Sequence, residues 1–168
     1  YTLTTDKVSQ VGLFGVLDKT GITPSLRVID VDITAGYDLG GLAGENRGNI
    51  EYCHSTGLVA TNDYGEQLGG LVGSNAYGSS IMNSYSTVEI TGNYYVGGLV
   101  GITSGTIDNS YATGAVSGNG LTGGFTGYNS SIITNSYSTG LLTDTDGSNY
   151  KIGGLIGSLW PQGLKGAH

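Results

Sequence analysis

Gly97-Gly98-Leu99-Val100-Gly101 is one of six closely similar pentapeptides in this chain of 168 residues. The copies occupy residues 11–15, 40–44, 69–73, 97–101, 123–127 and 153–157. Their second residues stand at 12, 41, 70, 98, 124 and 154, so the intervals are 29, 29, 28, 26 and 30 residues. A nearly constant period of this size is typical of proteins built by stacking one short unit on the next. Functional residues are therefore expected to form columns.

A second repeated segment follows the later pentapeptides. Residues 107–116 read Ile-Asp-Asn-Ser-Tyr-Ala-Thr-Gly-Ala-Val, and similar segments lie at 81–90, 133–142 and, more loosely, 50–59. Gly, Asn and Ser between the apolar stretches indicate turns between short strands, and helical periodicity is missing. The sequence thus predicts an all-β chain, a parallel β-solenoid (β-helix) of about five or six coils. A propeller is the alternative, but its blades need about 40 to 50 residues.

Alternate residues of a strand point to opposite faces, so parity predicts which side chains face the core. One class is small or aliphatic and is expected inside: Ser84, Ser86, Val88 and Ile90, with counterparts Cys53, Ser55, Gly57 and Val59. The other class is rich in tyrosine and threonine and is expected outside. In the opening unit, the same rule predicts that Ile29, Val31 and Ile33 face inward, whereas Asp30 and Asp32 face outward. The pentapeptide glycines are expected to allow a tight turn or a close approach of two backbones.

Composition excludes several classes of function. The net charge is −7 and the six Lys and Arg residues are scattered, which argues against nucleic-acid binding. The chain has no run of about 18 apolar residues, so membrane insertion is not expected.

The sequence begins at Tyr1 without an initiator methionine. We therefore expect a single β-solenoid domain over residues 1–168, cut from a larger protein. Trp160-Pro161 could be a cap of the solenoid or the start of the next element.

The pentapeptides, together with the Asn-Ser-Tyr-Ser-Thr-Gly segments, resemble the GLUG motif repeat, which is named after its Gly-Leu-any-Gly core. The resemblance runs from about Val11 to Gly157, and the opening unit departs from it by lacking the Asn-Ser-Tyr segment. Such repeats are typical of large bacterial surface or secreted proteins, including adhesin-like proteins and some immunoglobulin A-cleaving metallopeptidases. The resemblance implies a bacterial extracellular or cell-surface location and supplies no catalytic residues.

Residues for catalysis or metal binding are scarce. Cys53 and His54 are neighbours in a strand, so they point to opposite faces and cannot form a nucleophile–base pair. Asp30 and Asp32 are the one plausible carboxylate pair for a carbohydrate-active β-helix enzyme, but a solvated face explains them more simply. Residues 143–149 resemble the start of a calcium loop without its closing glutamate, and a polar turn is the alternative. We expect no catalytic residue, no metal and no cofactor.

Two outward columns form the candidate ligand-binding surface. Stacked coils would align the column His54, Tyr85, Tyr111 and Tyr137 beside the column Thr56, Thr87, Thr113 and Thr139. Exposed tyrosines suit a glycan or protein of a host or neighbouring cell. Alternatively, the rings only stabilise adjacent strands, or the threonines bind ice. The sequence therefore predicts a non-enzymatic structural or adhesive repeat module, acting as a rigid stalk or as a binding surface.

Overall fold

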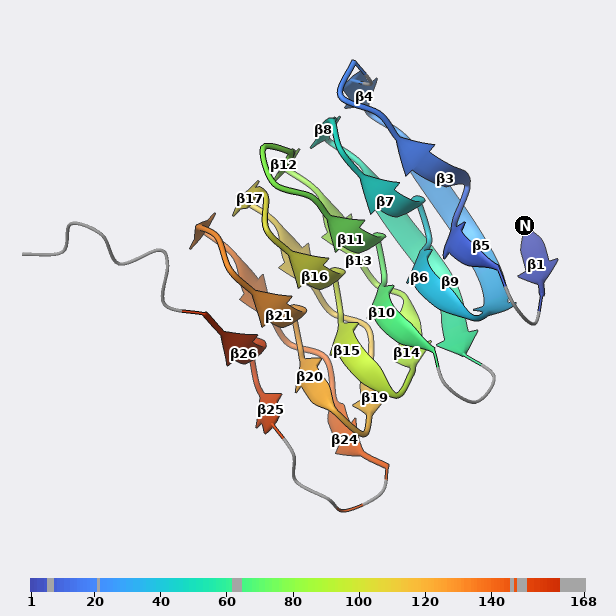
Figure 1. The fold of residues 1–168 in the computed structure, drawn as a ribbon, viewed down its shortest axis with the longest axis vertical. Coiled ribbons are helices and arrows are strands. Elements are labelled where there is room, and N and C mark those ends of the chain that lie inside the picture. The colour runs from blue at the N-terminus through green and yellow to red at the C-terminus, as the bar shows by residue number, and fades with distance from the viewer. Residues whose placement is uncertain (6–7, 21, 62–64, 146, 148–150, 161–168) are drawn as a thin grey trace, which may run out of the picture.

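The computed structural model describes residues 1–5, 8–20, 22–61, 65–145, 147 and 151–160. It shows a parallel β-solenoid of about five turns, which confirms the predicted fold. Strands from successive coils lie side by side along the stack, from blue at the N-terminal end to red at the C-terminal end (Figure 1). They form four parallel sheets, here named A to D, around one core.

The strands of each sheet are as follows. Sheet A contains β1 (Thr2–Thr4), β5 (Arg27–Ala35), β9 (His54–Thr61), β13 (Tyr85–Ser86), β14 (Glu89–Thr91), β18 (Tyr111–Ala112), β19 (Val116–Gly118), β23 (Tyr137–Ser138) and β24 (Leu142–Asp144). Sheet B contains β2 (Ser9–Val11), β6 (Tyr37–Gly40), β10 (Glu66–Gly69), β15 (Tyr94–Gly97), β20 (Leu121–Gly123) and β25 (Lys151–Gly153). Sheet C contains β3 (Phe14–Leu17), β7 (Ala43–Asn46), β11 (Val72–Asn75), β16 (Val100–Thr103), β21 (Thr126–Asn129) and β26 (Ile156–Leu159). Sheet D contains β4 (Ile22–Pro24), β8 (Asn49–Glu51), β12 (Ser80–Met82), β17 (Thr106–Asp108) and β22 (Ile133–Thr134).

Each coil passes through sheets A, B, C and D in that order, and the pentapeptide forms the corner between B and C. Its leucine turns into the core, where Leu42, Leu71 and Leu99 are fully buried. Aliphatic side chains from the other sheets meet them there, such as Ile81 from sheet D and Ile90 from sheet A. Burying a side chain of this size contributes about 1.5 to 3 kcal/mol. One stacked apolar core therefore holds the coils together.

The glycines of the four interior pentapeptides are required by close approach: none of them has a positive φ, and a Cβ added to any of them would lie less than 3.0 Å from a neighbouring atom. A Cβ on Gly98 would overlap the carbonyl oxygen of Gly124 in the next coil and lie 2.9 Å from the Cβ of Ala112 on sheet A. Gly41 and Gly70 face Ser55 and Ser86 in the same way. The second glycine of the motif and the small inward residues of sheet A thus let the two walls approach each other, as the sequence predicted.

Buried polar ladders satisfy the backbone at two corners. At the end of sheet C, Asn46 Nδ2 donates to Asn75 Oδ1 at 2.8 Å, and Asn75 Nδ2 donates to Thr103 Oγ1 at 3.0 Å. At the corner between D and A, the hydroxyl of Ser110 accepts a hydrogen bond from the backbone N–H of Ser84 at 3.2 Å. Cys53 takes the serine position one coil earlier and accepts from the N–H of Leu26 at 3.4 Å. These side chains pair buried groups that would otherwise cost free energy.

The predicted alternation of inward and outward residues is confirmed in the middle coils, where Ser86 and Ile90 are buried and Thr87 is exposed. In the opening unit the prediction for Ile29 is wrong. Ile29 is 48% exposed, and Val28 takes the inward position instead. The register of β5 against β9 shifts between Val28 and Val31, which inserts one extra residue, and Asp30 within it has a φ of 51°. Such a β-bulge reverses the parity of the residues before it.

Candidate ligand-binding surface

The predicted aromatic column forms a continuous ladder on the outer face of sheet A. The rings of His54 and Tyr85 stack with centroids 4.5 Å apart and planes 5° from parallel. Tyr85 and Tyr111 follow at 4.7 Å and 2°, and Tyr111 and Tyr137 at 5.2 Å and 6°. The ladder is a consequence of the strand register, which pairs these four residues directly. We call His54, Tyr85, Tyr111 and Tyr137 the aromatic ladder.

Arg27 extends the aromatic ladder by one coil and was missed in the sequence. Its position pairs with His54 across β5 and β9, and its Nε donates to His54 Nε2 at 3.2 Å. As the acceptor of this hydrogen bond, His54 Nε2 carries no proton. Only 8% of His54 is exposed. The available signal was spacing, because Arg27 lies 27 residues before His54, close to the period of the repeat. The opening unit lacks an aromatic residue at that position, which hid the correspondence.

The threonine column lies beside the aromatic ladder, two residues further along each coil. Thr87, Thr113 and Thr139 are exposed, and their backbone N–H groups donate to carbonyls of the preceding coil at 3.0 Å. Thr56 is half-buried because its Oγ1 accepts a hydrogen bond from the N–H of Asp30 at 3.0 Å. The structure therefore brings both predicted columns together on one face, with Thr56 engaged by the bulge.

Stacking restricts what the aromatic ladder can offer to a ligand. Tyr85 and Tyr111 each have a ring neighbour on both faces, so only their edges and hydroxyl groups reach solvent. Among the described residues, Tyr137 is the last ring of the ladder and is stacked on one face only, and 52% of the residue is exposed. Within the described part of the aromatic ladder, a sugar that stacks on an aromatic face would find one at Tyr137 alone, whereas hydrogen bonding to phenol groups could occur along the ladder.

Tyr111→Ala should destabilise the fold by about 2 to 3 kcal/mol, because it removes two stacked contacts worth about 0.5 to 1.5 kcal/mol each as well as buried ring area. Tyr137→Ala should cost about half as much, since that ring has one partner. Tyr111→Phe keeps the stack and should change stability by less than about 0.5 kcal/mol. Urea unfolding followed by circular dichroism measures all three. Equal losses for the two alanine variants would contradict a stabilising ladder.

The stability of the first coils should decrease as the pH is lowered, because of His54. Burial and the charge of Arg27 lower the pKa of His54 below its ordinary value of 6.5. The unfolded chain therefore takes up this proton more readily than the folded chain. The stability that depends on neutral His54 is fully present above pH 6.5. It is lost as the pH falls from 6.5 through the lowered pKa of the folded chain. Urea unfolding at pH 7.5 and 5.5 should show a smaller loss for His54→Tyr than for the native chain. Identical losses would refute this assignment.

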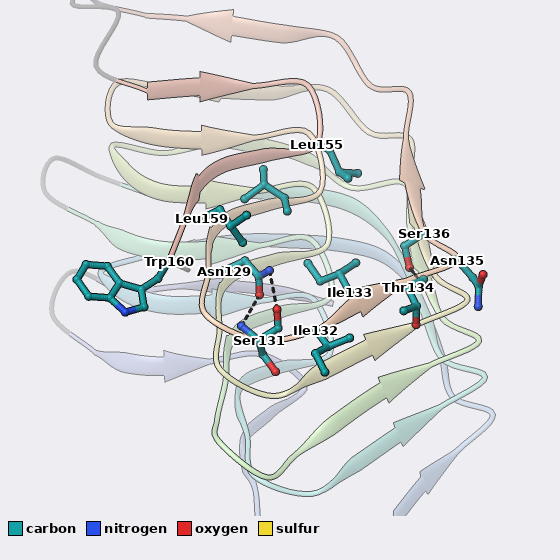
Figure 2. A pocket seen from close by; sticks show the side chains of 11 residues that line it. Asn129, Ser131, Ile132, Ile133, Thr134, Asn135, Ser136, Leu155, Leu159 and Trp160 are labelled. Carbon is teal, nitrogen blue, oxygen red and sulfur yellow. Dashed lines mark hydrogen bonds between the residues drawn. The ribbon is translucent and has the colours of Figure 1, made fainter. Parts of the chain in front are cut away.

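A cavity of about 440 Å³ lies at the C-terminal end of the stack. It is lined mainly by apolar side chains of the last coil, including Ile132, Ile133, Leu155, Ile156 and Leu159. In Figure 2, Leu155, Leu159, Ile132 and Ile133 surround it, and Trp160 lines it at one side. Trp160, at 53% exposed, does not close the end of the core. Pro161 lies outside the described residues.

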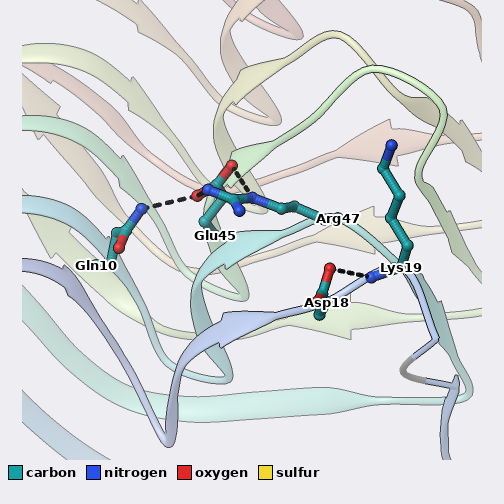
Figure 3. A network of polar contacts seen from close by, with 5 residues as sticks. All are labelled: Gln10, Asp18, Lys19, Glu45 and Arg47. Atoms are coloured by element: carbon teal, nitrogen blue, oxygen red, sulfur yellow. Dashed lines mark hydrogen bonds and ion pairs between the residues drawn. The ribbon is translucent and has the colours of Figure 1, made fainter.

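A polar cluster lies on sheets B and C near the N-terminal end (Figure 3). Glu45 accepts from Gln10 Nε2 at 2.7 Å and pairs with Arg47 at 2.7 Å. Asp38 lies nearby with a φ of 52°, and its Oδ1 is buried without a hydrogen-bond partner among the described residues. Burial, with the charges of Glu45 and Glu66, raises the pKa of Asp38 to about 6.

Asp38→Asn should stabilise the chain near neutral pH. Because the folded pKa of Asp38 is raised, the charged form weakens the fold above pH 6, and the native chain gains stability as pH falls from about 6 toward 3.8. Asparagine removes the charge and tolerates a positive φ. After allowance for solvent screening, the gain should be about 1 kcal/mol at pH 7.5 and smaller at pH 4.5. Chemical denaturation at both pH values tests this, with the exposed Asp32→Asn as control. A gain that is the same at both pH values would contradict it.

The other groups considered for chemistry are separated. Cys53 faces the core and His54 the outer surface, each with its own partners. Asp30 and Asp32 are both exposed on β5. In the region suggested as a calcium loop, Asp144 Oδ1 accepts from the N–H of Gly147 at 3.0 Å, and Asp146 and Ser148 to Asn149 lie outside the described residues. Among the residues that the structure describes, no group of three or more His, Cys, Asp or Glu residues could hold a metal ion.

Comparison with known proteins supports the repeat. The GLUG motif matches residues 64–91 and 92–117, two consecutive copies in the middle of the stack. Over 79 residues the chain is 35% identical to halomucin of Haloquadratum walsbyi, which covers 47% of this chain and 1% of halomucin. That organism is an archaeon, so a bacterial origin stays a prediction. No solved structure matches the chain. The described residues contain no helix that is long and apolar enough to cross a membrane.

Proposed function

We propose that the chain is a rigid, non-enzymatic structural module of an extracellular surface protein. The observation that carries this proposal is that each coil is locked to the next on several sides at once. The aromatic ladder binds the outer face of sheet A, the asparagine ladder binds one corner, and backbone pairing runs through all four sheets. A stack with so many independent links resists bending, as a stalk requires.

The extracellular setting rests on the comparisons. The GLUG motif and the relative named halomucin both favour a repeat module of a surface protein. The chain spans 1% of that relative's length, so the proposal of a stalk rests on the properties of the module itself. Those properties are length, stiffness and a repeated outer face.

Stiffness can be tested by the distance between two spin labels. Asp32 and Leu141 are exposed and lie in one column of sheet A, four coil steps apart by register. At about 4.8 Å a step, their backbones should be about 19 Å apart. With Cys53→Ser to remove the native thiol, labels at Asp32→Cys and Leu141→Cys should give one narrow distance distribution by pulsed electron spin resonance. A broad or multiple distribution would refute a rigid stalk.

Glycan binding is the second candidate function, and the open ring face of Tyr137 beside exposed Thr139 favours it. If a sugar stacks on this face, Tyr137→Ala should abolish binding in a glycan array, whereas Tyr85→Ala should leave it. If sugars instead hydrogen-bond to the phenol edges, Tyr85→Phe and Tyr111→Phe should weaken binding as well. If binding survives all of these substitutions, the aromatic ladder is not the glycan site. If the chain binds proteins and no glycan, the ligand is a protein.

A further inference from the structure

The turn between β11 and β12, which joins sheets C and D in the middle of the stack, departs from the repeat. It consists of residues 76–79, between Asn75 and Ser80. At the equivalent positions of the coils before and after it, the turn takes only residues 47–48 and 104–105. These turns follow one another along one edge of the stack, where Figure 1 shows β8, β12 and β17. The neighbouring coils make the same connection without the extra two residues, so the fold does not require them.

The longer turn carries Tyr77 into solvent. Tyr77 is 89% exposed, and no other large apolar side chain among the described residues is more exposed. Gly78 follows it with a φ of 81°, the left-handed conformation that glycine adopts in tight turns. A ring in this position contributes little to stability, because burial of apolar area is what stabilises the fold. Both of its faces are therefore open to a ligand.

A groove of about 320 Å³ lies between this turn and the two coils that follow. Tyr77 and Gly78 line it from the turn itself, Ser104 and Thr106 from the next coil, and Ser131 from the coil after that. Small-molecule sites have volumes of about 300 to 1,000 Å³, so the groove is at the lower end of that range. The groove runs along the side of the stack, across successive coils.

The lining of the groove is uncharged and rich in hydroxyl groups. All eight residues that line it are Ser, Thr, Tyr or Gly. The hydroxyl of Ser80 already donates a hydrogen bond to Asn49 Oδ1 at 2.8 Å. In contrast, the side-chain hydroxyls of Thr106 and Ser131 make no hydrogen bond to another described residue. Two polar groups in the groove can thus bind a ligand without breaking a bond within the chain.

We propose that this groove binds a sugar unit of an uncharged glycan, which stacks on the ring of Tyr77 and bonds to the hydroxyls of Thr106 and Ser131. A pyranose has apolar C–H faces and a rim of hydroxyl groups, so it matches an exposed ring beside polar groups. The chain carries a net charge of −7, which disfavours an acidic glycan, and the described lining has no Lys or Arg to offset it. This site is separate from Tyr137 on sheet A and does not depend on the role as a stalk.

An array of neutral oligosaccharides of glucose, galactose, mannose and N-acetylglucosamine should identify a sugar that binds, and titration calorimetry then measures its affinity. Tyr77→Ala should weaken binding at least about tenfold because the stacked contact is lost, whereas Tyr77→Phe should weaken it less than about threefold. Thr106→Val keeps the shape but removes the hydroxyl, and should weaken binding about three- to tenfold. Deletion of Tyr77 and Gly78 together gives the turn the length of its neighbours and should abolish binding in a folded chain.

Tyr52→Ala is the matched control, because Tyr52 is 58% exposed at the corner between sheets D and A and does not line the groove. It should leave the affinity unchanged. Circular dichroism should show that the variants are folded, since each changes only exposed residues.

Three outcomes would overturn the proposal. The native chain could bind none of these sugars, or the affinity could survive Tyr77→Ala. Alternatively, binding could be lost in Tyr137→Ala but kept in Tyr77→Ala, which would place the sugar on the aromatic ladder. None of these outcomes changes the distance between the spin labels, so this site can fail while the stalk stands, and the reverse.

Discussion

Gly98→Ala is expected to destabilise the folded chain by more than about 3 kcal/mol, the range reserved for severe core lesions. The new methyl group would overlap the carbonyl of Gly124 in the next coil and press on Ala112 across the core. Backbone on one side and a packed wall on the other leave nothing flexible to move aside. The two walls would have to separate, which would weaken strand pairing in both sheets at once. Urea unfolding gives the loss directly.

Gly154→Ala provides the matched control for this prediction. Gly154 has the same place in the last pentapeptide, but a Cβ there would meet nothing within 4 Å because the next coil is missing from the described residues. Its stability should change by less than about 0.5 kcal/mol. If Gly98→Ala were as mild as Gly154→Ala, close approach would not be the reason for the glycines. The two variants therefore distinguish a loss of stability caused by contact with the next coil from one caused by alanine in the motif itself.

Asn75→Ala should cost about 3 kcal/mol through the buried polar ladder. Asn75 Oδ1 accepts from Asn46 Nδ2 at 2.8 Å and from the hydroxyl of Ser79 at 2.7 Å, while its Nδ2 donates to Thr103 Oγ1 at 3.0 Å. Alanine removes all three bonds inside the core and leaves a small cavity. Thermal and urea unfolding should both show the loss.

Asn49→Ala is the comparison for Asn75→Ala, since Asn49 is exposed and its Oδ1 accepts a hydrogen bond from the hydroxyl of Ser80 at 2.8 Å on the surface. It should cost less than about 0.5 kcal/mol. Asn75→Asp is informative as well, because it keeps the shape and both acceptor roles but loses the donor to Thr103. If Asn75→Ala were as mild as Asn49→Ala, backbone pairing alone would hold this corner.

The sequence was sufficient to predict the architecture because the repeat supplies its own alignment. Period and parity together placed Ser86 and Ile90 inside and Thr87 outside, and both placements depend only on regular strands. The prediction failed at Ile29, where a bulge inserts one residue into β5. Nothing in the local composition marks a bulge, because it arises from the fit between two neighbouring coils.

The candidate site was predictable as a set of columns but not as a surface. The register brought His54, Tyr85 and Tyr111 together as expected, yet the parallel stacking of their rings depends on side-chain rotamers that spacing does not determine. That stacking is what limits ring-face contacts to Tyr137. The position of Arg27 beneath His54 was also hidden, because the opening unit has diverged from the motif.

Pairing between nearest neighbours has a consequence for inheritance. Gly98 and Gly124 hold equivalent places in successive coils, and each coil is bonded only to the coil before and the coil after. Loss or duplication of the segment from Gly98 to Gly123 would join one Gly-Gly corner to another and keep every remaining register. A gene for such a chain can therefore gain or lose whole units through unequal recombination. Each resulting protein would still have a complete core.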